Sequence, residues 1–267
     1  MPLPLLLMAA AGVVADPCVG EPSFSPELTT WRASVYARGN KTMLPPPVAA
    51  ATAYRAAYME ARRQDWADLC HYRADNLRLR ALPPSARQVV FMGDSITEAW
   101  AFGDPGLFQP GWIDRGVSGQ TTPQMLVRFP QDVIALHPRV VHIMAGTNDI
   151  AGNTGPTTLD AIEGNIAAMV ALAKAAGIRV VLAATPPSAG FTWTPDLKPA
   201  PIIAALNARL KALAEREKIE FVDYGTVLAT PDGALRPNFS LDGTHPNADG
   251  YAAIEPLVNA AVEKAAR

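Results

Sequence analysis

The chain is poor in the residues that mark nucleic-acid, metal and membrane proteins. Its 267 residues carry 23 Lys and Arg against 25 Asp and Glu, and the formal net charge of −2 leaves no basic surface of the kind that binds nucleic acid. Only two cysteines and four histidines are present, and they do not have the spacing of a metal site. No apolar run is long enough to span a membrane. We therefore expect no nucleic-acid partner, no bound metal and no transmembrane segment.

Apolar residues, by contrast, make up 49% of the chain, and charged residues 18%. Such a composition can bury a sizeable core, and the length suits one large domain or one domain with an extension. The sequence contains no internal repeat and no low-complexity tract. We expect a globular protein, and nothing in the sequence indicates its oligomeric state.

Residues 1–15 are apolar and small, and they end in Val-Val-Ala, which resembles a signal-peptidase site. No Lys or Arg precedes the apolar run, so either the signal is a weak one or the true start lies upstream. We expect a secreted or periplasmic protein. In an oxidising compartment the only two cysteines, Cys18 and Cys70, can form a disulfide, and the alternative is two unrelated thiols.

Residues 16–84 are expected to form an N-terminal extension. The stretch 16–46 is rich in Pro and Ser and has little periodicity, which predicts an extended lead-in. Over 47–82 apolar and aromatic residues recur at helical spacing, and charged residues such as Arg62 lie between them. We interpret those charges as a solvated face. The role of the extension is left open.

Residues 85–267 alternate between strand and helix patterns. Short apolar runs predict strands at 88–92, 112–117, 139–145, 178–184 and 219–223. Helical patterns follow at 122–136, 158–176, 201–217 and 247–265. Strands that alternate with helices imply right-handed βαβ units and a parallel sheet covered on both faces. We therefore expect an α/β domain with about five parallel strands.

A serine follows the first predicted strand. The apolar run breaks at Gly93, and Ser95 begins a stretch that can start a helix. Open α/β sheets place their sites at this carboxyl end of the strands, and a helix N-terminus favours developing negative charge. A nucleophilic serine fits this position. The alternative is that Ser95 or Asp94 only caps the helix.

Three later motifs supply partners for such a serine. Gly116 and Gly119 follow the second strand, where either can expose a backbone N–H, and Asn148 follows the third, where its amide suits an oxyanion. The alternative for the Asn148 motif is a turn. Asp242 and His245 lie three residues apart, so the carboxylate can fix the imidazole tautomer for proton transfer from a serine. The alternatives for this last pair are a surface turn or half a metal site.

Two connections, at 99–112 and 185–201, are long for such a fold and rich in aromatic residues. We place both beside Ser95, because long loops at the active end of a sheet are usually functional. Trp100 and Trp193 are the candidate substrate-binding residues in these connections. The alternative is that each ring only anchors its own loop.

Taken together, the four motifs resemble those of the SGNH hydrolases, also called the GDSL family of esterases and lipases. Gly-Asp-Ser, a Gly after the second strand, Gly-x-Asn-Asp and Asp-x-x-His occur in the family's order within residues 87–265. The resemblance implies a flavodoxin-like three-layer α/β/α sandwich and a reaction without metal or organic cofactor. The chain departs from the family at Ile96, where the family name has Leu, and at Gln120, where relatives often have Asp.

Carried over residue by residue, the resemblance makes Ser95 the nucleophile, with Asp242 and His245 completing a catalytic triad. It builds the oxyanion hole from the backbone N–H groups of Ser95 and Gly119 and the side chain of Asn148. We therefore expect a serine esterase that acts through an acyl-enzyme.

The expected substrate is a short-chain ester, preferably an acetyl ester on a carbohydrate. The sequence has no strongly apolar insertion that would serve a long acyl chain, and the aromatic residues of its loops suit sugar rings. The alternatives are a general short-chain carboxylesterase, a lysophospholipase or a thioesterase. A non-catalytic carbohydrate-binding module is the hypothesis from a different class, and an intact set of Ser, Asp and His argues against it.

Overall fold

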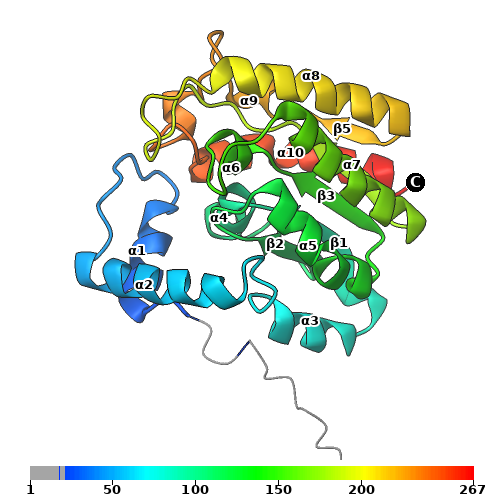
Figure 1. Cartoon of the computed structure of the whole chain (residues 1–267), viewed down its shortest axis with the longest axis horizontal. Coiled ribbons are helices and arrows are strands. Elements are labelled where there is room, and N and C mark those ends of the chain that lie inside the picture. Colours follow the sequence, from blue (N-terminus) through cyan, green and yellow to red (C-terminus); the bar gives the residue numbers. More distant parts are fainter. Residues whose placement is uncertain (1–17, 19–21) are drawn as a thin grey trace, which may run out of the picture.

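The structure, a computed structural model, describes Cys18 and residues 22–267, so the expected signal segment at 1–15 lies outside the described residues. Its centre is a sheet of five parallel strands in the order β2-β1-β3-β4-β5 (Figure 1). The strands are β1 (Arg87–Gly93), β2 (Gly111–Gly116), β3 (Val140–Met144), β4 (Arg179–Ala183) and β5 (Glu220–Val222). The expected α/β fold is confirmed.

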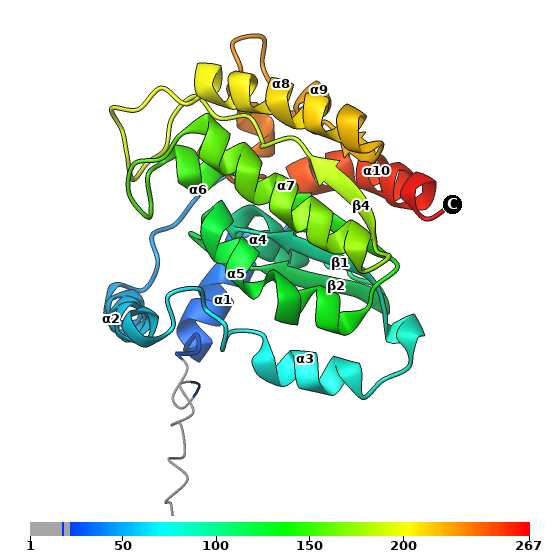
Figure 2. The same ribbon diagram turned by 45° about the vertical axis from the view of Figure 1, so that its right-hand side comes forward.

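The sheet is apolar on both faces, and a layer of helices covers each face (Figures 1 and 2). Along β1 the side chains alternate, with Val90 and Met92 in one core and Val89 and Phe91 in the other. The first core is closed by α5 (Thr122–Asp132), α7 (Leu159–Ala175) and α8 (Ala200–Glu217), and the second by α4 (Ser95–Gly103) and α10 (Ala248–Ala265). Shorter elements are α6 (Thr147–Ile150), α9 (Gly225–Leu228) and 3-10 turns at Pro84–Ala86, Ile134–Leu136 and Pro237–Phe239.

The strand order creates a crevice for a site, because β1 lies between β2 and β3. After β1 the chain returns through α4 on one face of the sheet, whereas after β3 it returns through α7 on the other. Open α/β folds bind their ligands where neighbouring strands send their connections to opposite faces. Ser95 follows β1 and Asn148 follows β3, so both lie at this crevice.

The N-terminal extension contains α1 (Pro26–Val35), α2 (Val48–Gln64) and α3 (Arg73–Arg80), on the side of the sheet where β2 is the edge (Figures 1 and 2). The expectation of an extended lead-in over 16–46 is therefore wrong for α1. Ser25 caps this helix, and its hydroxyl accepts a hydrogen bond from the N–H of Leu28. The buried face of α1 consists of Leu28, Arg32 and Val35. Because the central residue of this face is a charged arginine, the apolar residues do not recur at helical spacing and the sequence shows no helical pattern here.

The helical region expected over 47–82 is two helices joined by a turn. α2 ends at Gln64, and the chain turns over 65–72 before α3 begins. Within this turn Asp68 adopts a left-handed backbone with a φ of 52°. The helix expected over 122–136 also ends early, at Asp132, and a 3-10 turn follows it.

The connection expected at 99–112 lies at the wrong end of the sheet for the site. α4 continues to Gly103, so residues 104–110 connect it to β2, and a connection that follows a helix reaches the amino end of the next strand. Trp100 lies on α4 and is fully buried, stacked on Tyr251 with ring centroids 5.4 Å apart. Trp100 is thus a core residue, and the prediction that it binds substrate is wrong.

A disulfide joins Cys18 to Cys70, 52 positions apart, and ties the start of the extension to the turn between α2 and α3. Within the described residues no helix is both long and apolar enough to cross a membrane. In that same part of the chain, no group of three or more His, Cys, Asp or Glu side chains is placed to hold a metal ion.

The double variant Cys18→Ser/Cys70→Ser should unfold with a free energy lower by about 2–4 kcal/mol, because the bridge restricts the unfolded chain. Urea denaturation of the variant and the wild type measures the difference. Intact-mass measurement after thiol blocking, with and without reductant, verifies that the wild type carries the bridge. Equal urea midpoints would show that the disulfide contributes nothing to stability.

Candidate functional site

Ser95 is the first residue of α4, at the sharp turn that follows β1. The turn is tight because Gly93 has no side chain: a Cβ there would lie 2.0 Å from the hydroxyl oxygen of Thr97. Asp94 caps the helix, and one of its carboxylate oxygens accepts from the N–H of Ile96 at 2.9 Å. The capping role thus belongs to Asp94, which leaves the Ser95 hydroxyl available for another partner.

His245, in the loop before α10, is that partner. Its Nε2 lies 2.8 Å from the hydroxyl oxygen of Ser95, and its Nδ1 lies 2.7 Å from one carboxylate oxygen of Asp242. The other carboxylate oxygen accepts from the main-chain N–H groups of Thr244 and His245, at 2.9 and 2.8 Å. Segments 150 positions apart therefore contribute to one hydrogen-bonded chain, and the main chain fixes the orientation of the carboxylate.

Asp242 and His245 shift each other's pKa. Burial alone would raise the pKa of Asp242. The hydrogen bond and charge of His245, with the main-chain N–H groups, have the larger, opposite effect and lower this pKa to about 2. Burial lowers the pKa of His245, but the hydrogen bond and charge of Asp242 raise it above its ordinary value. Asp242 is therefore ionised at neutral pH and holds the proton of the neutral imidazole on Nδ1, so that Nε2 faces Ser95 as an acceptor.

The loop after β2 reaches the same place. The N–H of Val117 donates to the carbonyl of Gly93 at 3.1 Å, which joins this loop to the end of β1. Gly119 has a φ of 78°, a conformation that glycine adopts without strain. Its carbonyl accepts from the side-chain amide of Asn153 at 3.1 Å. The backbone of the loop is therefore fixed at both ends.

Asn148, on α6 after β3, lies between the turn of β1 and the loop of β2. Its Nδ2 is 3.1 Å from the carbonyl of Gln120 and 3.2 Å from a carboxylate oxygen of Asp94. Its Oδ1 accepts from Nδ2 of Asn153 at 2.8 Å. Both amide hydrogens of Asn148 thus have acceptors. A ligand oxygen beside this amide would compete with Asp94, the more distant of the two acceptors, for one of these hydrogens.

Trp193 also lies at the site, because the connection 185–201 follows β4 directly and so reaches the carboxyl end of the sheet. Its ring centroid is 6.3 Å from that of His245, and its Nε1 donates to Asn153 at 3.2 Å. The buried ring of Phe191 stacks against it at 5.1 Å, and Trp193 remains 41% exposed. An exposed ring held in this way is placed to contact a ligand beside the histidine.

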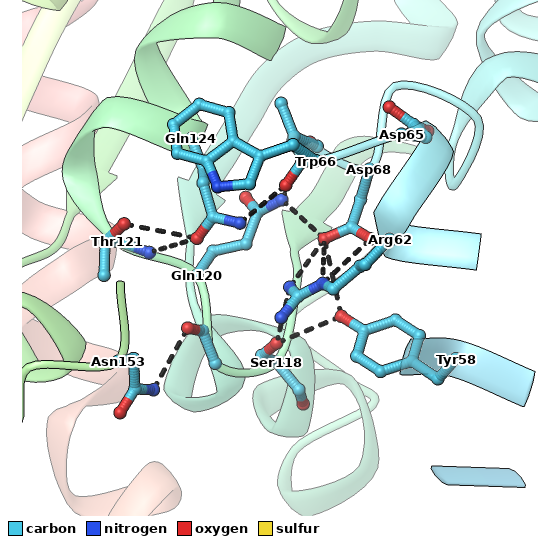
Figure 3. A network of polar contacts seen from close by, with 12 residues as sticks. Tyr58, Arg62, Asp65, Trp66, Asp68, Ser118, Gln120, Thr121, Gln124 and Asn153 are labelled. Carbon is cyan, nitrogen blue, oxygen red and sulfur yellow. Dashed lines mark hydrogen bonds and ion pairs between the residues drawn. The ribbon is translucent and has the colours of Figure 1, made fainter. Parts of the chain in front are cut away.

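Several residues around the site were not predicted, because they carry no motif or come from the extension. Asn153 belongs to no motif, although it contacts Asn148. Tyr36 and Met43 line a small pocket beside the histidine. The expectation of a solvated Arg62 is wrong, since its guanidinium forms an ion pair with Asp68 at 2.6 Å (Figure 3).

Comparison with known families places the chain in one of them. The sequence model of the GDSL-like lipase/acylhydrolase family matches residues 91–253, which is more than half of the chain. The chain belongs to this family. As a GDSL-like acylhydrolase it is a carboxylic ester hydrolase, and the matched segment contains Ser95, Asn148 and His245.

Two solved structures resemble this GDSL-like chain over nearly their whole length. A candidate acylhydrolase of Bacteroides fragilis is 48% identical, with a TM-score of 0.72, and the match covers 76% of this chain and 99% of that one. A GDSL-like lipase of Bacteroides thetaiotaomicron is 44% identical, with a TM-score of 0.71 and coverage of 74% and 98%. An acetylxylan esterase of Geobacillus stearothermophilus is 23% identical over 67% of this chain and 94% of its own, with a TM-score of 0.54, and shares the fold. No protein with a curated description matches the chain.

Asp242→Asn should lower the pKa of His245, because it removes the negative charge that stabilises the imidazolium. The wild-type histidine should titrate above its ordinary value of 6.5 and the variant histidine below the wild type. NMR titration of the imidazole C2 proton measures both, with the resonance assigned by its loss in His245→Gln. A pKa that stays the same or rises in the variant would contradict the coupling.

Proposed function

We propose that this enzyme hydrolyses esters by nucleophilic catalysis, with Ser95 as nucleophile, His245 as general base and Asp242 as the group that orients the imidazole and stabilises its charged form. One observation carries the proposal: the continuous hydrogen-bonded chain from the Ser95 hydroxyl through both nitrogens of His245 to Asp242, at 2.8 and 2.7 Å. A carbohydrate-binding module has no use for such a relay, because binding alone requires no proton transfer.

In the proposed reaction, Nε2 of His245 takes the hydroxyl proton as the oxygen of Ser95 attacks the ester carbonyl. The carbonyl oxygen becomes an oxyanion, which accepts hydrogen bonds from the N–H groups of Ser95 and Gly119 and from the amide of Asn148. His245 then protonates the leaving alcohol, and an acyl-enzyme remains. Water, deprotonated by the same nitrogen, attacks the acyl-enzyme, releases the acid and restores Ser95. These steps need no metal or organic cofactor.

The proposed substrate is a short-chain ester, preferably an acetyl ester, on a carbohydrate. The exposed ring of Trp193 beside His245 offers an apolar face with a polar edge, which suits a sugar ring. Ser118 and Asn153 are exposed around the loop of Gly119, and the hydroxyl oxygen of Ser118 and the side-chain carbonyl oxygen of Asn153 each keep a lone pair that can accept from a sugar hydroxyl. The Geobacillus protein with the same fold is by name an acetylxylan esterase. A general short-chain carboxylesterase is the alternative.

We further propose that residues 85–267 are the catalytic domain, that 16–84 are an extension of it, and that the protein is secreted or periplasmic. The family match at 91–253 falls inside the proposed domain. The disulfide between Cys18 and Cys70 supports an oxidising compartment, because reducing compartments keep most thiols unpaired.

Ser95→Ala should abolish ester hydrolysis and leave the fold intact, since loss of the nucleophile cost on the order of 10⁶ in kcat in a well-studied serine protease. Hydrolysis of p-nitrophenyl acetate and labelling by a fluorophosphonate probe measure the loss. Ser34→Ala, which removes an exposed hydroxyl on α1, is the matched control and should keep both. Retention of more than a few per cent of activity by Ser95→Ala would exclude Ser95 as the nucleophile.

Activity should be highest on acetyl esters and fall steeply by octanoyl. An enzyme with an open apolar groove would instead bind longer acyl chains more tightly, by roughly 0.8 kcal/mol for each CH₂ buried. A series of p-nitrophenyl esters measures this dependence. Trp193→Ala should raise KM for an acetylated sugar more than for p-nitrophenyl acetate, which has no sugar ring to stack. A rate that rises with chain length to octanoyl would favour a lipase or lysophospholipase instead.

A further inference from the structure

Residues of the N-terminal extension hold the loop that carries Gly119 (Figure 3). The carbonyl of Ser118 accepts from the guanidinium of Arg62 at 3.4 Å and lies 3.4 Å from the hydroxyl of Tyr58, whose single hydrogen is shared between this carbonyl and Asp68. A trans peptide unit is planar, with its C=O and the following N–H on opposite sides. Groups that bind the Ser118 carbonyl therefore also set the direction of the Gly119 N–H, which belongs to the same peptide unit.

Asp68 organises these contacts. Its carboxylate binds Arg62 through Nε at 3.0 Å and through Nη2 at 2.6 Å, and the residue is only 6% exposed. A charge-assisted pair of this kind holds the guanidinium in one orientation. Asp68 reaches this position with a φ of 52°, a conformation that residues with a side chain keep only where their surroundings impose it.

The same carboxylate also holds Gln120. Nε2 of Gln120 donates to Asp68 at 3.0 Å and to the carbonyl of Ala67 at 2.9 Å, while its Oε1 accepts from Arg128 at 2.5 Å. An anion on one side and a cation on the other thus fix a fully buried amide. The main-chain carbonyl of Gln120 in turn accepts from Nδ2 of Asn148 at 3.1 Å.

We propose that Asp68 is a positioning residue that aligns two oxyanion donors, the Gly119 N–H and the Asn148 amide, so that the extension completes the active site. The proposal rests on the roles given to these donors under the proposed function. Asp68 and Arg62 lie outside the family match at 91–253, so that match does not account for them.

The proposal can be tested by exchanging the two side-chain groups that meet in the contact between Asp68 and Gln120, a carboxylate and an amide. Asp68→Asn removes the charge that holds Arg62, and Gln120→Glu sets a second carboxylate against Asp68 at a contact that is now 3.0 Å. Each single variant should lower kcat by about tenfold or more and change KM by less than about threefold, because removing one oxyanion donor costs roughly 10²–10³ in kcat.

The double variant Asp68→Asn/Gln120→Glu again places an amide opposite a carboxylate, and the carboxylate still faces Arg128. Its kcat should exceed that of Gln120→Glu by about threefold or more, which is the non-additivity expected of residues in direct contact. It should stay below that of the wild type, because Arg62 still lacks the anion that holds it. Labelling of Ser95 by a fluorophosphonate, whose phosphoryl oxygen occupies the oxyanion hole, should follow the same order. A purely structural role would not move this rate.

Asp75→Asn is the matched control. Asp75 is also a carboxylate of the extension, but its arginine partners, Arg78 and Arg115, lie on α3 and β2. This variant should lower the melting temperature and leave both kcat and the labelling rate unchanged. Melting temperatures of all variants separate lost stability from lost alignment.

Loss of kcat in both single variants, with a double variant that is more active than Gln120→Glu, supports the proposal. An unchanged kcat in the single variants, or a double variant no more active than Gln120→Glu, overturns it. The second comparison holds even where Asp68→Asn alone is too unstable to assay. Activity retained by Ser95→Ala would instead refute the proposed function, whatever the Asp68 variants show.

Discussion

A single buried guanidinium, that of Arg128 on α5, ties together the strand ends on which the site is built. It donates to the main-chain carbonyls of Gly93 and Arg115, at 2.9 and 2.8 Å, where β1 and β2 end. It also pairs with Asp132 at 2.9 Å, and both side chains are completely buried. An unpaired charge at this depth costs several kcal/mol, so the arrangement is stable only because an anion and carbonyl oxygens surround the cation.

Gln120 extends this network from the sheet into the extension. Its side-chain amide lies between the guanidinium of Arg128 and the carboxylate of Asp68. The carboxylate of Asp68 in turn pairs with the guanidinium of Arg62, so the amide and the carboxylate connect two cations. A buried polar network contributes to stability and rigidity when each member has its partner, and one missing partner affects its neighbours. The loop of Gly119 is attached to this network, which explains how a surface loop keeps a defined backbone beside the serine.

Most strands were predictable because they are apolar on both faces and read as continuous runs, whereas β2 contains Asp114 and Arg115 and has a weaker pattern. Each observed bound lies one residue from the predicted one. The positions of Ser95, Asn148 and His245 at one end of the sheet were predictable, because each residue follows a strand or precedes a helix within a short motif. Trp100 was misassigned because the aromatic residues before and after the end of α4 were read together as one loop, although Gly103 and Pro105 mark the end of the helix beyond Trp100.

Tertiary contacts explain the rest of what the sequence did not show. Arg32 occupies a buried position in α1 because it pairs with Glu98 of α4 at 2.8 Å, a partner 66 positions away. Arg62 is held by a carboxylate that is presented only when Asp68 adopts a left-handed backbone. Charged residues on a surface helix are usually solvated, and local patterns contain no sign of either partnership.

The contact between Asn148 and Asp94 bears on how the proposed site changes during reaction. Burial raises the pKa of Asp94 to about 6, despite the N–H of Ile96 and the charge of His245, so the carboxyl is mostly ionised at neutral pH. In that state it gives the Asn148 amide an acceptor at 3.2 Å, which avoids the cost of a buried donor without a partner. An oxyanion that attracts the same amide brings a second negative charge close to Asp94. In the proposed reaction the imidazolium of His245 forms in the same step, because the proton leaves the serine as its oxygen attacks, and its positive charge offsets both. The proposed mechanism therefore couples proton transfer and oxyanion formation by electrostatics as well as by bonding.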